Sequence, residues 1–123
     1  MREIKNTKRY DLEERTLEFA KRVRQFVKRL PKTVANIEDA KQLVRSSGSV
    51  GANYIEANEA LSKKDFLMRI KICRKESKET MYWLSLLEVH CANVLLRKEC
   101  QLLNAEAKEL MMIFSAIMRK SQP

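Results

Sequence analysis

The chain has 123 residues, and its 25 Lys and Arg against 16 Asp and Glu give a formal net charge of +9. With 45% hydrophobic residues but only two Gly and two Pro, the composition favours one core of long helices and disfavours a β-sandwich or β-barrel. No apolar run approaches the ~18 residues of a membrane span, and the charged N-terminus does not resemble a signal peptide. We therefore expect a cytoplasmic protein without a membrane partner.

The first helix is predicted over residues 11–30. Asp11, with Glu14 three residues later, forms a capping pattern, and Pro31 ends the run. Apolar residues and one Thr recur at helical spacing and form the predicted inner face: Leu12, Thr16, Phe19, Val23, Phe26, Val27 and Leu30.

The second helix is predicted over residues 34–60. Its expected inner face consists of Ile37, Ala40, Val44, Ser47, Gly51 and Ile55. Gly48 and Gly51 are the only glycines of the chain, and each costs a helix about 0.5–1 kcal/mol relative to Ala. That cost predicts a packing notch, entered by another backbone or by a large side chain. Phe66, Trp83 and Phe114 are the candidates to fill it.

The third helix is predicted over residues 62–91, starting from a capping pattern at Ser62. Its inner face is expected to hold Phe66, Ile70, Cys73, Ser77, Thr80, Leu84, Leu87 and Cys91. The fourth helix is predicted over residues 98–120, with an inner face of Leu103, Ala107, Leu110, Met111, Phe114, Ile117 and Met118. Short connections between the helices predict one domain over residues 1–123, an antiparallel up-down-up-down four-helix bundle.

The third helix carries a second apolar flank beside its inner face. The flank consists of Met68, Ile72, Trp83 and Leu86, and His90 extends it. A surface helix needs only one apolar stripe of about 100°. Because the flank holds the only Trp, it favours packing against another copy of the chain, where aromatic residues and Met are enriched. The alternative is that Trp83 widens the internal core.

Two stretches, QLVRSSGSVGANYIEANEALSKKDF and KICRKESKETMYWLSLL, resemble the four-helix-bundle proteins encoded in intervening sequences of bacterial 23S ribosomal RNA genes. The matching residues are Arg45, Ser46, Ser49, Val50, Asn53, Glu56, Ala57, Ser62, Phe66, Lys75, Glu76, Glu79, Thr80, Trp83 and Leu84. The resemblance covers the second and third helices closely and the others by length and pattern. It implies a homopentameric ring, similar in architecture to the accessory proteins of diversity-generating retroelements, and it brings no catalytic residues.

Basic residues gather on single faces of two predicted helices. The third helix has Lys64, Lys71, Arg74, Lys75 and Lys78, with Tyr82 continuing the face, and the first has Lys21, Arg24 and Lys28. Like charges three and four residues apart repel one another, whereas phosphates would neutralise them and release counterions. These faces predict low-specificity binding of RNA or DNA backbone. An ordinary solvated surface and a protein adaptor that docks an acidic partner, such as a reverse transcriptase or a ribosomal component, remain the alternatives.

Catalysis is not expected from this inventory of residues. Leu87 stands three residues before His90, so the Glu-x-x-His pairs of di-iron bundles are absent. The charged residues of the middle helices are better suited to structural ion pairs: Arg45, Glu56, Glu76 and Glu79. Adjacent helical residues diverge by about 100°, so His90 and Cys91 cannot chelate a metal together, and no cofactor is implied.

Overall fold

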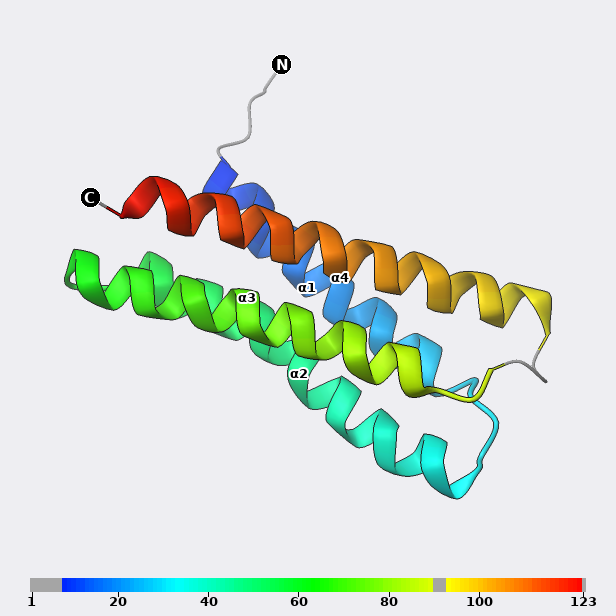
Figure 1. The fold of residues 1–123 in the computed structure, drawn as a ribbon. Helices are drawn as coiled ribbons and strands as arrows, with labels where there is room; N and C mark the ends of the chain where they lie inside the picture. Colours follow the sequence, from blue (N-terminus) through cyan, green and yellow to red (C-terminus); the bar gives the residue numbers. More distant parts are fainter. Residues whose placement is uncertain (1–7, 90–92, 123) are drawn as a thin grey trace, which may run out of the picture.

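The computed structural model describes residues 8–89 and 93–122, and every regular element within them is an α-helix. The helices are α1 (Lys8–Val27), α2 (Val34–Asn58), α3 (Lys63–Leu86) and α4 (Val94–Ser121). They run antiparallel, each packs on the next along the chain, and α4 returns to α1 (Figure 1). The predicted all-helical four-helix fold is confirmed. The diagonal pairs, α1 with α3 and α2 with α4, lie farther apart, and side chains meet between them in the core: the rings of Tyr54 of α2 and Phe114 of α4 have their centroids 5.7 Å apart.

The helix starts follow side-chain caps, not all of which were predicted. Ser62 accepts a hydrogen bond from the Asp65 N–H at 3.0 Å and caps α3 as expected. Asn93 accepts from the Leu96 N–H at 2.8 Å, so α4 begins at Val94 rather than at residue 98. The predicted cap at residue 11 was wrong, because α1 already begins at Lys8.

Three helices end earlier than the sequence predicted. α1 stops at Val27, and the turn that follows closes with backbone bonds from Arg29 to Phe26 and from Leu30 to Val27. The residue before a proline is disfavoured in the helical region, which accounts for this early stop before Pro31. α2 ends at residue 58 and α3 at residue 86, where the next residue is extended. The predicted helical residues 90 and 91 lie outside the described part of the chain.

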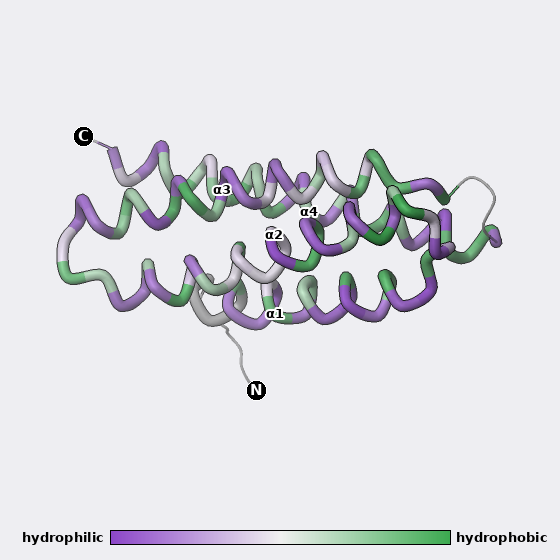
Figure 2. Tube along the Cα trace, turned by 90° about the horizontal axis from the view of Figure 1, so that it is seen from below, coloured by the Kyte–Doolittle hydropathy of each residue, from purple (hydrophilic) through white to green (hydrophobic). Residues whose placement is uncertain are grey.

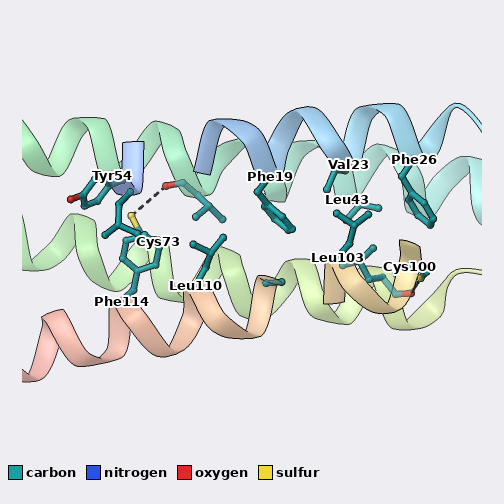
Figure 3. Close-up of a cluster of buried hydrophobic side chains, with 14 of the residues drawn as sticks. Phe19, Val23, Phe26, Leu43, Tyr54, Cys73, Cys100, Leu103, Leu110 and Phe114 are labelled. Atoms are coloured by element: carbon teal, nitrogen blue, oxygen red, sulfur yellow. Dashed lines mark hydrogen bonds between the residues drawn. The ribbon is translucent and has the colours of Figure 1, made fainter. Parts of the chain in front are cut away.

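The core is a continuous column of buried side chains from all four helices, and ten of them are labelled in Figure 3. Hydrophobic and hydrophilic positions alternate along each helix at the spacing of an amphipathic helix (Figure 2). The inner faces predicted for α1, α3 and α4 are largely those found, with Phe19, Ile70 and Leu110 fully buried. In α3, Phe66 is only partly buried.

The predicted inner face of α2 was correct in part: Ser47 is buried, and Ala40 and Val44 are partly buried and pack against the core. The prediction was wrong at the two isoleucines. Ile37 and Ile55 are 44% and 51% exposed, whereas Asn36 is buried. The buried residues of the helix are Asn36, Leu43, Ser46, Ser47, Val50, Tyr54 and Ala57. The amide of Asn36 bonds the Pro31 and Glu88 carbonyls at 3.0 and 3.1 Å, and its oxygen accepts from the Glu88 N–H at 2.8 Å. These bonds join the α1–α2 connection to the chain after α3, and they fix the rotation of α2.

Both glycines lie where α1 crosses α2, so the predicted notch exists but Phe66, Trp83 and Phe114 do not fill it. A Cβ on Gly51 would lie 2.8 Å from Oγ1 and 3.1 Å from Cβ of Thr16. A Cβ on Gly48 would lie 3.2 Å from a terminal nitrogen of Arg24. The absence of side chains on α2 therefore lets α1 approach closely at Thr16 and lets the Arg24 guanidinium lie against the helix.

Candidate nucleic-acid interface

The predicted basic face of α3 is exposed along its whole length. All five of its cations are exposed: Lys64, Lys71, Arg74, Lys75 and Lys78. None of them forms an ion pair within 4.0 Å among the residues that the structure describes. The charge of Lys75 acts on Glu79, one helical turn away, and helps to lower the pKa of that carboxyl. The face therefore presents a row of cations to solvent.

The neighbours of α3 divide its outward surface into two halves. Hydrogen bonds of Arg69 and Thr80 mark the side that faces α2, whereas a bond from Asn104 to the Met81 carbonyl marks the side that faces α4. At about 100° per residue, Lys71 and Lys78 lie on the outer half toward α4. The apolar flank lies on the half toward α2: Met68, Ile72, Trp83 and Leu86. Lys75 stands at the border, within about 20° of Met68 and Leu86 around the helix axis, so the cations and the apolar flank adjoin each other.

The basic face of α1 points away from that of α3. Lys21, Arg24 and Lys28 are exposed and form no ion pair within the described ranges. Arg24 donates to the carbonyl of Ala20 at 3.2 Å, which holds its guanidinium along the helix. Because α1 and α3 are diagonal in the bundle, their outer faces are turned in opposite directions. One copy of the chain therefore has two separate basic faces.

The seam between α1 and α4 pairs two other arginines, which the sequence analysis missed. Arg15 donates to both carboxylate oxygens of Glu106, at 2.7 and 2.9 Å, and reaches Glu109 at 3.4 Å. Arg22 pairs with Glu99 at 3.4 Å. The hydrogen bonds that Arg15 donates to Glu106 raise the pKa of its guanidinium further. The signal was present in the sequence, because two arginines and two glutamates are each spaced seven residues apart on antiparallel helices.

Three of the four residues proposed for structural ion pairing lie together between α2 and α3. Arg45 contacts Glu76 at 3.4 Å and also forms an ion pair with Glu79. Glu79 accepts a hydrogen bond from the indole N–H of Trp83 at 2.9 Å, and this bond, followed by the charge of Arg45, lowers its pKa. Glu56 is exposed and belongs to no such cluster within the described residues.

The residues predicted to pack in the notch or against another copy of the chain differ in their burial. Phe66 and Trp83 are partly buried and pack against the core, as in the alternative in which the Trp widens it. Met68 and Leu86 are 48% and 44% exposed, so the outer part of the flank leaves a large share of its surface open to solvent. Ile72 is partly buried as well.

Metal sites, reactive cysteine thiols and membrane-spanning helices are three further features that the described residues could provide. No three His, Cys, Asp or Glu side chains come together in a group that could hold a metal ion, and the pair His90 and Cys91 lies outside the described ranges. Burial raises the pKa of the Cys73 thiol to about 12 and also raises that of Cys100. In the same residues, no helix is long and apolar enough to cross a membrane.

Comparisons with known proteins agree on one family. The profile of the family described as 23S rRNA-intervening sequence protein matches residues 8–116. A crystal structure from Bacteroides thetaiotaomicron, of a protein of unknown function from the S23 ribosomal protein family, is 31% identical with a TM-score of 0.75. The match covers 92% of this chain and 99% of that one. Among curated proteins, no match is found.

Proposed function

The chain belongs to the family of 23S rRNA-intervening sequence proteins, and from that premise we propose that it binds the backbone of RNA or DNA with little sequence preference. The observation that carries the proposal is the separation of its cations into two groups. Arg15, Arg22 and Arg45 form ion pairs with carboxylates at the seams between helices, whereas the cations of the two basic faces form none within the described residues. Phosphates would neutralise those faces and release counterions.

The proposed activity is binding in the cytoplasm rather than catalysis. The acidic residues that chemistry would need are already engaged, since Arg45 contacts both Glu76 and Glu79. Backbone contacts position a protein on nucleic acid without reading its sequence, and Lys and Arg on a plain helix face are suited to such contacts. An rRNA fragment, an unrelated RNA and a DNA of equal length should therefore bind with similar affinity.

We also propose that the chain assembles into a homopentameric ring, the state that the family resemblance implies. The exposed side chains of Met68 and Leu86 support this proposal, because they extend an apolar surface that is partly buried at Trp83. Lys71 and Lys78 lie on the other half of the outer surface, toward α4, so a neighbouring copy can cover the apolar surface without covering those two cations. The native mass, measured with and without nuclease, tests the ring, and a monomer in both samples would refute it.

Fluorescence anisotropy with labelled RNA and DNA tests the binding. We expect the affinity to fall steeply between about 50 and about 200 mM salt, with a slope that reflects the number of neutralised phosphates. Two variants with the same change of charge compare the faces: Lys71→Gln, Lys75→Gln and Lys78→Gln on α3, and Lys21→Gln, Arg24→Gln and Lys28→Gln on α1. Every phosphate that a variant no longer neutralises should reduce the salt slope by about 0.7 on a single strand. Absence of salt-sensitive binding by the unmodified protein at micromolar concentration would refute the proposal.

A further inference from the structure

An exposed aromatic side chain stands at the end of the basic face of α3. Tyr82 is 58% exposed, and it belongs to the small set of aromatic residues that make up 7% of the chain. Lys78, Lys75 and Lys71 precede it on the same outward half of the helix. At a rise of 1.5 Å per residue they lie about 6, 10 and 16 Å from it along the helix axis. An aromatic ring and three cations thus form one line.

The ring of Tyr82 is held in position by its neighbour Trp83. Its ring meets that of Trp83 edge to face, with the ring centroids 5.1 Å apart and an angle of 71° between the rings. Trp83 is held in turn, because its indole N–H donates to Glu79, which pairs with Arg45 of α2. Since the Tyr82–Trp83 contact is perpendicular, it leaves most of the Tyr82 side chain open for another flat group.

Resting on the proposed function, we propose that this face takes single-stranded polynucleotide, with one base stacked on Tyr82 and the adjoining phosphates against Lys78, Lys75 and Lys71. Only an unpaired strand has bases whose flat faces are free to stack on a protein side chain, whereas a duplex keeps them stacked on one another. Stacking on an aromatic ring tolerates any base, which agrees with binding that does not read sequence. Cations that follow the backbone beside such a ring are the general arrangement of single-strand sites.

The test compares a labelled single strand, as RNA and as DNA, with a duplex that carries the same number of phosphates. Trp83 is the only Trp of the chain and touches Tyr82, so its fluorescence reports a base that arrives there. We expect the single strand to bind more tightly than the duplex and to quench Trp83, and we expect no quenching from the duplex. Because anisotropy reports any binding and the quenching reports stacking, the two readouts separate the proposed function from this inference.

Variants of Tyr82 complete the test. Tyr82→Ala should weaken single-strand binding by about 5- to 150-fold, the effect of removing one base stack, and should leave duplex binding unchanged. Tyr82→Phe keeps the ring and should bind within about twofold of the parent protein, because stacking does not use the hydroxyl. Met112→Ala removes a side chain of similar exposure, 54%, from α4 and should have no effect. Thermal unfolding of each variant shows that the fold is retained.

The outcomes distinguish the two claims. Equal affinity for single strand and duplex, with Tyr82→Ala unchanged, would overturn the stacking site and leave backbone binding intact. A parent protein that binds neither probe at low salt would overturn the proposed function, and the stacking site with it. Quenching by the single strand that disappears in Tyr82→Ala and persists in Tyr82→Phe would support the inference.

Discussion

Replacing each glycine of α2 by alanine should change the stability of the protein in opposite directions. Both substitutions gain about 0.8–1.0 kcal/mol of helix propensity, because both positions lie in the helix interior. In Gly48→Ala the new methyl meets only the end of the Arg24 side chain, at 3.2 Å, which can move into solvent. We therefore expect Gly48→Ala to stabilise the fold by about 0.5–1 kcal/mol.

Gly51→Ala meets a different neighbour and should destabilise the fold. Its methyl would lie 2.8 Å from Oγ1 and 3.1 Å from Cβ of Thr16, and 3.7 Å from the Thr16 backbone carbon. Thr16 cannot turn away easily, since its hydroxyl donates to the Leu12 carbonyl at 2.7 Å and its side chain is buried. Overpacking of this kind costs about 1–3 kcal/mol, which exceeds the propensity gain by up to about 2 kcal/mol.

Urea unfolding followed by circular dichroism, at one fixed protein concentration, measures the difference between the two variants. We expect Gly51→Ala to be less stable than Gly48→Ala by about 1–3 kcal/mol. Adding Thr16→Ala should restore part of the stability that Gly51→Ala removes and should not help Gly48→Ala, with a coupling energy of about 0.5–3 kcal/mol. Two variants stabilised by the same amount would refute the close approach of α1 at Gly51.

Three further substitutions or conditions test other parts of the fold. Asn36→Ala should lower the free energy of unfolding by about 1–3 kcal/mol, because it leaves the partly buried N–H and carbonyl of Glu88 without their partner; a decrease below about 0.5 kcal/mol in urea unfolding would contradict this. Cys73, with its pKa at about 12, should resist alkylation at pH 8 and react only in urea, as judged by mass spectrometry of its peptide. The lowered pKa of Glu79 contributes stability above the unfolded carboxyl value of about 4.3, which is lost as the pH falls through the folded value. Trp83→Phe removes the indole hydrogen bond to Glu79, so it should be less stable than the parent protein at neutral pH. This difference in the free energy of unfolding should narrow below about pH 4, and a difference that stays constant with pH would contradict the role of the hydrogen bond.

The fold could be predicted from the sequence wherever the apolar pattern was strong. Phe19, Ile70 and Leu110 recur with their neighbours at helical spacing, and burial of such stripes fixes how α1, α3 and α4 turn toward the core. The cap at Ser62 could also be predicted, because a Ser followed three residues later by an acid is the typical pattern at the start of a helix. The cap at Asn93 was missed, since it stands before a run that is not strongly amphipathic at its start.

The rotation of α2 could not be predicted in the same way. Hydropathy favours Ile37 as an inner residue, but the neighbouring Asn36 is buried because backbone groups of two distant segments converge on it. Ser46 is buried too, where it bonds Thr80 of α3 at 2.9 Å. Polar side chains of this kind carry no apolar signal, and the partners that satisfy them are known only once the helices are assembled.

The basic faces were visible in the sequence, but their relation to one another was not. Spacing alone places Lys71 and Lys78 on one face of α3, and Lys21 and Lys28 on one face of α1. That the two faces are turned in opposite directions depends on the order of the helices around the bundle, in which α1 and α3 are diagonal. The two faces therefore cannot act as one surface in a single copy. Comparison of the two triple variants measures how much each face contributes to binding.

The structure gives a reason to expect that α3 contributes more to binding. Its acids Glu76 and Glu79 are turned toward α2 and paired with Arg45, which offsets their charge, although Lys75 still interacts with Glu79. On α1, by contrast, Glu14 and Glu18 are exposed within two turns of Lys21, and acids at this spacing offset part of the positive potential of the lysine and repel phosphates. The α3 triple variant should therefore lose more affinity and more salt dependence than the α1 variant, although both lose three positive charges. Equal effects of the two variants would mean that net charge alone, and not the arrangement of the acids, governs binding.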